Sequence, residues 1–199
     1  MRYLLVLGIA ALLTLTETPA TRAGGGGYDA APTGLNDSLT NRVSKMLTKG
    51  VRGCWDKLDK PYRYDCYRDV YQSSARLLEG NPAYDGARKA LLDVEASLTR
   101  TIQKNADPAA PRARRGLKSF QAIRPEALPS AKQDFVKALD SGYTQLLRSP
   151  SSGTHYTRIA QALETNKLLL RSAMLMLPVP DVMKAALIRA MALPEPVSL

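Results

Sequence analysis

The two cysteines are the residues whose spacing carries the clearest chemistry. Cys54 and Cys66 lie six positions on either side of Lys60, and Asp59, Lys60 and Pro61 mark a turn between two helical patterns. Across an antiparallel hairpin these cysteines come level, whereas one straight helix would separate them by about 18 Å. A disulfide needs Cα atoms about 4.4–6.8 Å apart. The spacing therefore predicts a structural disulfide across a helical hairpin, and it does not match the Cys-x-x-Cys pair of redox enzymes.

The other residues capable of acid–base or metal chemistry form no catalytic pattern. His155 is the only histidine, and it lies in a Ser/Gly/Thr-rich break near an expected helix start, without an HExxH or CxxCH motif. Asp65 and Asp69 are four residues apart and can share a helix face. Arg63 and Arg68 flank them, which favours ordinary ion pairing over a protonated acid. We therefore expect no catalytic residue, no metal and no cofactor, and this is a prediction of a non-enzymatic protein.

Aromatic and basic side chains are concentrated around the predicted turn. Residues 55–71 contain the single tryptophan and four of the nine tyrosines, with arginines between them. One interpretation is that the rings pack across the hairpin and the charges pair locally. The other is that rings not needed for packing form a partner surface, because Trp, Tyr and Arg dominate protein interfaces. The candidates for partner binding in this segment are Trp55, Tyr62, Arg63, Tyr64, Tyr67 and Arg68.

A second candidate surface is a basic, proline-containing connection. Residues 104–124 carry a net charge of +5. Such a run is either a solvated loop or a contact for an anionic surface, and for an exported protein we expect headgroups, envelope polymers or an acidic protein rather than nucleic acid. Its candidate residues are Arg112, Arg114, Arg115, Lys118 and Arg124.

These residues must be positioned by helices, because apolar residues recur with a helical period along most of the chain. Asn36 is a fitting cap for a helix over 39–58, and a second helix follows from Pro61 to Gly80. Asn81 caps a third over 82–102, Ser130 caps a fourth that ends before 149–153, and 154–177 and 182–193 complete the set. The apolar second half of 154–177 predicts a position enclosed by the core. The segment 105–130 is expected to be a long connection with a helical turn over 117–123, and no strand is expected.

The chain organisation follows from composition. An apolar run over 4–15 after a basic start, with small residues before position 24, predicts an export signal over 1–23. A flexible leader over 24–35 follows, then a single helical domain over 36–193 that divides into 36–104, the connection 105–130 and C-terminal helices 131–193, and a tail over 194–199. Removing 1–23 leaves 26 bases against 17 acids, a net charge of +9. The fold class expected is all-α, a small bundle of about five to six helices with a disulfide-clamped N-terminal hairpin.

The function expected from these features is binding. A protein exported to the periplasm or beyond, and carrying a basic surface, suits contact with an envelope protein or an anionic envelope surface. Two alternatives stay open at this point. One is a small-ligand carrier or an enzyme with a cavity in the bundle, converging on His155 or on Asp65 and Asp69. The other is a peripheral membrane protein led by the apolar segment 182–193.

Overall fold

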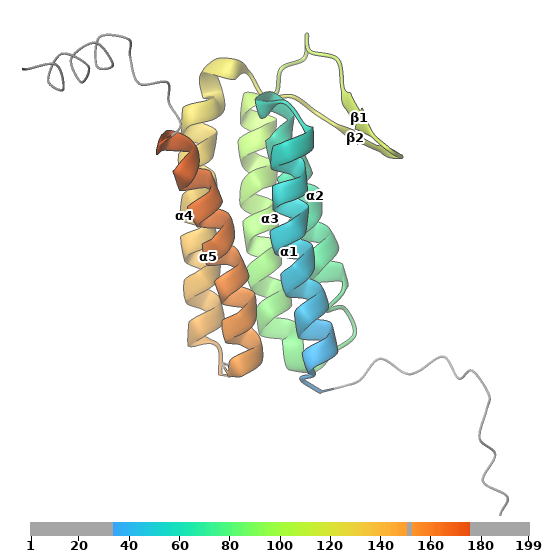
Figure 1. Ribbon diagram of the computed structural model, residues 1–199, viewed down its shortest axis with the longest axis vertical. Coiled ribbons are helices and arrows are strands. Elements are labelled where there is room, and N and C mark those ends of the chain that lie inside the picture. The colour runs from blue at the N-terminus through green and yellow to red at the C-terminus, as the bar shows by residue number, and fades with distance from the viewer. Residues whose placement is uncertain (1–33, 151–152, 176–199) are drawn as a thin grey trace, which may run out of the picture.

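The helices form a closed ring in the computed structural model, which describes residues 34–150 and 153–175 (Figure 1). Each helix packs against the next along the chain, and the last packs against the first. Successive helices alternate in direction, so the first and fifth run parallel where the ring closes. The helices of the described residues are α1 (Asp37–Lys57), α2 (Arg63–Arg76), α3 (Asp85–Asn105), α4 (Leu128–Arg148) and α5 (Thr154–Leu175). The predicted all-α bundle is confirmed, and the expected helix over 182–193 and signal over 1–23 lie outside the described residues.

Local chemistry sets several helix boundaries as expected. The Asn36 side chain accepts a hydrogen bond from the Leu39 N–H and caps α1. Asn81 does the same for Ala83 at the start of the short 3₁₀ helix η2 (Pro82–Tyr84), which leads into α3. A second 3₁₀ helix, η1 (Lys60–Tyr62), makes the turn between α1 and α2.

The predicted disulfide joins α1 to α2 beside this turn. Cys54 and Cys66 are bonded, with their Cα atoms 5.8 Å apart, and both are buried. The helices also approach closely further along, because a Cβ atom at Gly50 would lie 2.8 Å from Val70 Cγ1. Disulfides persist in oxidising compartments, so the bond is typical of an extracellular type of environment.

An aromatic cluster fills the centre of the ring. The Phe135 ring from α4 stacks on Tyr67, with centroids 5.3 Å apart, and meets the edge of Tyr71 at 5.8 Å. Asn166 from α5 is buried and donates a hydrogen bond of 2.9 Å to the Tyr71 hydroxyl. Aromatic pairs of this geometry add to the stabilisation that burial provides. Three helices, α2, α4 and α5, are thereby joined through one set of side chains.

Burial of the tyrosine hydroxyls predicts loss of stability in alkali. Burial raises the pKa of Tyr64 from 10 to about 12 and raises the pKa values of Tyr67 and Tyr71 as well. The unfolded chain releases these protons near pH 10, so the stabilisation is complete below pH 10 and is lost as the pH rises through the folded-state values. We expect tyrosinate absorbance and loss of far-UV circular dichroism to rise together above pH 10. Complete tyrosine ionisation with helicity intact would contradict this prediction.

Two expectations about the connection are wrong. Residues 117–123 do not form a helical turn, because β1 (Ala113–Arg115) and β2 (Lys118–Phe120) pair as an antiparallel hairpin. Gly116 at its turn has φ +59°, a left-handed conformation that glycine favours. Helix α4 begins at Leu128 rather than after a Ser130 cap, because the 3₁₀ helix η3 (Pro125–Ala127) starts the helical turn earlier.

Residues 165–172, the part of the second half of α5 whose side chains the structure describes, are not fully enclosed as expected. Leu170 is 2% exposed, but Leu168 is 56% exposed. The physical reason is the ring itself: α5 packs against α1 and α4, and the side turned away from the ring faces solvent.

Candidate functional site

The β-hairpin projects beside the bundle and carries most of the basic segment (Figure 1). Ala113 pairs with Phe120 and Arg115 with Lys118, so these four share one face of the hairpin. Phe120 is 3% exposed, which shows that this face turns toward the bundle. Arg114 lies on the opposite face.

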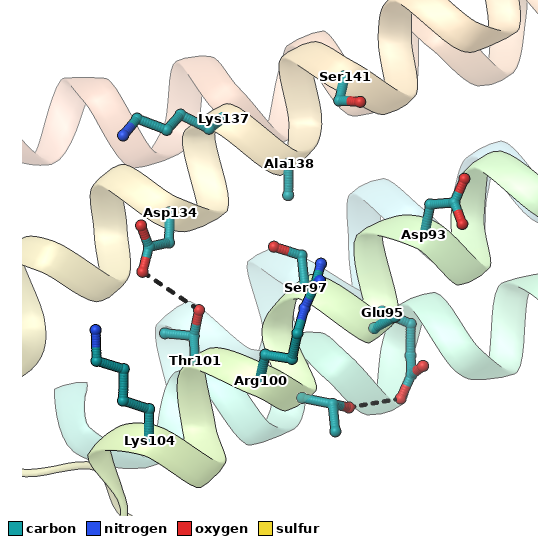
Figure 2. Close-up of a pocket in the computed structure, with 12 residues that line it drawn as sticks. Asp93, Glu95, Ser97, Arg100, Thr101, Lys104, Asp134, Lys137, Ala138 and Ser141 are labelled. Atoms are coloured by element: carbon teal, nitrogen blue, oxygen red, sulfur yellow. Dashed lines mark hydrogen bonds between the residues drawn. The ribbon is translucent and has the colours of Figure 1, made fainter.

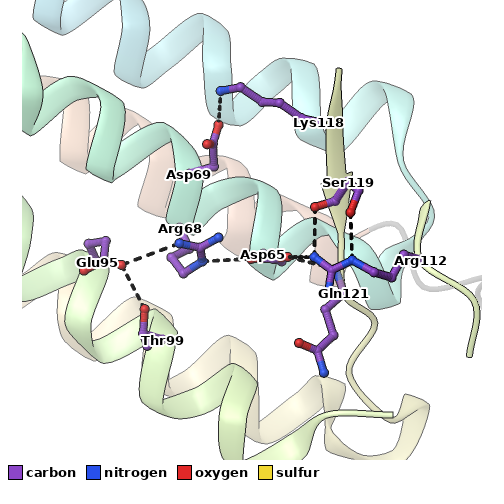
Figure 3. Close-up of polar contacts among 9 residues, drawn as sticks. All are labelled: Asp65, Arg68, Asp69, Glu95, Thr99, Arg112, Lys118, Ser119 and Gln121. Atoms are coloured by element: carbon purple, nitrogen blue, oxygen red, sulfur yellow. Dashed lines mark hydrogen bonds and ion pairs between the residues drawn. The ribbon is translucent and has the colours of Figure 1, made fainter. Parts of the chain in front are cut away.

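Asp65 of α2 anchors the base of the hairpin (Figure 3). Its carboxylate accepts hydrogen bonds of 2.8 Å from the Gln121 backbone N–H and from Arg68 Nε, and the Arg112 guanidinium lies 3.8 Å away. Although charged, its side chain is only 5% exposed. A buried carboxylate with this set of donors is stabilised by them, so Asp65 holds the hairpin rather than presenting a free acid.

Further contacts fix the hairpin on the turn and on α2. Lys118 pairs with Asp69, one helical turn beyond Asp65. The Tyr62 hydroxyl donates a hydrogen bond of 2.8 Å to the Pro111 carbonyl. The Ile123 backbone N–H donates one of 3.1 Å to the Pro61 carbonyl. The segment expected to be a loose connection is therefore held in place on both sides of the hairpin.

The outer part of the hairpin is exposed, basic and apolar at its tip. Arg114 and Arg115 are exposed, and neither has an acidic partner among the described residues. The Arg115 guanidinium instead reaches over α1, 3.3 Å from where a Cβ atom of Gly53 would stand. Leu117, in the turn, is fully exposed. A rigid base thus carries a tip with two unpaired cations and one apolar side chain.

The remaining basic candidates are engaged within the chain. Arg112 Nε donates a hydrogen bond of 2.7 Å to the Ser119 hydroxyl, and Arg124 pairs with Glu126 at 3.4 Å. Both side chains are about half exposed, as is Lys118 in its pair with Asp69. These residues contribute positive charge to the surface, but their positions are set by internal contacts.

Most of the aromatic candidates are not available to a partner. The expectation that Tyr64 and Tyr67 present their rings at the surface is wrong, since they are 7% and 1% exposed. They pack edge-to-face with centroids 5.8 Å apart, because α2 turns this side toward the core. Tyr62 holds the connection, as described above, and Arg68 pairs with Asp65 and with Glu95. The burial of Tyr64 and Tyr67 and the local pair of Asp65 with Arg68 agree with the packing interpretation.

Trp55 and Arg63 remain as a separate, partly exposed pair. The Arg63 guanidinium lies 4.4 Å from the centroid of the Trp55 ring, and its Nε donates a hydrogen bond of 2.8 Å to the Leu58 carbonyl. Trp55 and Gly53 are separated by about 200° around α1. The pair therefore faces a different side of the helix from the hairpin arginine over Gly53, and the two parts of the predicted surface do not form one patch.

His155 lies at the other end of the bundle and has a structural role. Its Nδ1 is 2.9 Å from the Thr40 hydroxyl, which in turn lies 2.6 Å from the Tyr84 hydroxyl. Tyr84 donates a hydrogen bond of 2.9 Å to the Asn36 carbonyl. This network joins the starts of α1, α3 and α5. The described residues show no group of three or more His, Cys, Asp or Glu placed to hold a metal.

Two features of the site were missed from the sequence. Asp65 anchors the hairpin, whereas only local ion pairing was expected of it. Leu117 lies in the turn of the hairpin, whereas a helical turn was expected there. The available signal for the turn was Gly116, which stands between Arg115 and Leu117, although short hairpin loops are best recognised as Asn-Gly or Asp-Gly.

No protein-family model, curated protein or solved structure matches the chain. Within the part of the chain that the structure describes, no helix is both long and apolar enough to span a membrane.

Proposed function

We propose that this is an exported, non-enzymatic protein that binds an anionic component of the cell envelope through its basic hairpin. The observation that carries the proposal is the tip of the hairpin, where Arg114, Arg115 and Leu117 are exposed on a base anchored by Asp65. Unpaired arginines with an apolar neighbour suit both electrostatic attraction and desolvated contact.

Export is supported by two further features. The Cys54–Cys66 disulfide suits an oxidising compartment, and residues 1–23 have the pattern of an export signal. In such a compartment the net charge of +9 that remains without residues 1–23 favours encounter with anionic envelope partners. An acidic protein and an anionic lipid surface offer the same charge to the hairpin, so the test must distinguish them.

Photo-crosslinking in the producing cells separates these sources. A photoreactive residue in place of Leu117 is expected to give one dominant adduct, a protein or a lipid, that weakens at high salt. The matched control is the same residue in place of Leu168, which is exposed on α5. No adduct at Leu117, or the same adducts at both positions, would overturn the proposal.

The charge of the tip provides a second prediction. Changing Arg114 and Arg115 together to Gln is expected to weaken the salt-sensitive adduct while leaving helicity intact, because neither side chain has an internal ion pair in the described chain. Arg112 is left unchanged because it binds Ser119. The control is Arg42→Gln with Lys45→Gln, which removes the same charge from an exposed part of α1. Equal effects of the two double variants would show that net charge, rather than the hairpin, governs the contact.

A further inference from the structure

A long surface groove runs between α3 and α4, on the side of the ring away from α1. It consists of two cavities of about 870 Å³ and 720 Å³ that both include Ser141 in their lining. From Gly86 at one end to Lys104 at the other, the lining residues of α3 extend over about 27 Å at 1.5 Å per residue. The hairpin site shares none of these residues.

Small side chains along facing positions make this groove. Ser97 on α3 and Ala138 and Ser141 on α4 line the larger cavity. Beneath the groove α3 and α4 approach closely, because a Cβ atom at Gly142 would lie 2.9 Å from Val94 Cγ2. Close backbones with small side chains leave the longer charged side chains to form the walls, as Figure 2 shows.

Those walls carry three basic and three acidic side chains, and most of the side chains without an ion pair are basic. Arg100 and Lys104 of α3 and Lys137 of α4 line the larger cavity, and within the described chain none of the three has an acidic partner. The one acid of the cavity without an ion pair is Asp134, which accepts a hydrogen bond of 3.5 Å from Thr101. The other two acids are engaged: Asp93 pairs with Lys89, and Glu95 pairs with Arg68.

Hydroxyl groups and a further cation continue this chemistry along the groove. Ser97 and Ser141 can donate hydrogen bonds to anionic oxygens in the larger cavity. Arg148, which has no acidic partner among the described residues, lines the far end of the smaller cavity. Positive charge and donors are therefore distributed along the groove instead of converging on one point.

We propose that this groove binds an extended polyanion, a chain of repeating phosphate or carboxylate groups. A single small anion would meet only one or two of the cations, whereas a chain lying along α3 and α4 meets Arg100, Lys104 and Lys137 together and extends toward Arg148. The length of the groove and the spread of its charges therefore favour long anionic chains over short anions.

The test uses inorganic polyphosphate, with pyrophosphate as the short anion and poly-glutamate as the carboxylate chain. Isothermal titration of the oxidised protein is expected to show tight binding of polyphosphate or poly-glutamate and weak binding of pyrophosphate. Arg100→Gln with Lys137→Gln is expected to weaken the chain's affinity about tenfold or more, because two charged contacts are lost. The α1 variant Arg42→Gln with Lys45→Gln removes the same charge from an exposed helix face outside both proposed sites, and it is expected to bind nearly as the wild type does.

A variant without a charge change tests the shape of the groove. Ser141 is exposed and lies where the two cavities meet, so Ser141→Leu blocks the groove there with little effect on folding. It is expected to reduce the preference for long chains over pyrophosphate. Equal losses in the groove variant and in the α1 variant, or binding that does not depend on chain length, would overturn the inference. Neither outcome changes what is expected of the crosslinking at Leu117. The groove proposal and the hairpin proposal can therefore be refuted independently.

Discussion

Replacing Phe135 by Ala is expected to lower the free energy of unfolding by about 3–5 kcal/mol. The Phe135 ring is 1% exposed, stacks on Tyr67 and meets the edge of Tyr71, so its removal leaves a cavity in the centre of the ring. The surrounding helices are held by one another around the ring and cannot collapse fully into the space. Urea unfolding followed by far-UV circular dichroism measures the loss.

The matched control lies on the same helix. Leu147 is 41% exposed, so Leu147→Ala removes an apolar side chain from α4 without opening an enclosed cavity. Its effect is expected to stay within about 1 kcal/mol. Similar losses for the two variants, or a loss below about 1 kcal/mol for Phe135→Ala, would show that the aromatic cluster does not hold the ring together.

Replacing both Cys54 and Cys66 by Ala is expected to lower the free energy of unfolding by about 3 kcal/mol, because the disulfide restricts the unfolded chain. The two cysteines are 12 positions apart, and both side chains are buried between α1 and α2. The variant should still fold, since α1 also packs against α5 and α2 against α3. Differential scanning calorimetry of the two proteins measures the loss as a lower Tm.

Reduction of the wild type gives an independent comparison. The reduced protein keeps both sulfur atoms in the core but lacks the covalent bond, so it separates the effect of the bond from that of packing. A reduced protein that unfolds like the Cys54→Ala, Cys66→Ala variant is the expected result. An unchanged Tm after complete reduction would contradict a stabilising role for the disulfide.

The five helices of the described residues and the disulfide could be predicted from the sequence. Helix periodicity and caps such as Asn36 and Asn81 are local, because they depend on residues within a few positions of each other. The Cys54–Cys66 bond was predictable for a related reason, since the short turn between two helices brings symmetric positions level. Ion pairing around Asp65 was also expected, although its partners on the hairpin were not.

Which of the candidate residues reach the surface depends on tertiary contacts and could not be predicted from the sequence. Tyr64 and Tyr67 lie beside charged residues in the sequence, Arg63, Asp65 and Arg68, but contacts with distant helices bury the two rings. The hairpin depends on contacts as distant as that of Gln121 with Asp65, 56 positions away. The groove exists because small side chains meet where the neighbouring helices α3 and α4 pack on each other. Periodicity shows that a helix has an apolar side. Which helix covers that side, and which charged side chains remain without an ion pair, depends on residues far apart in the chain.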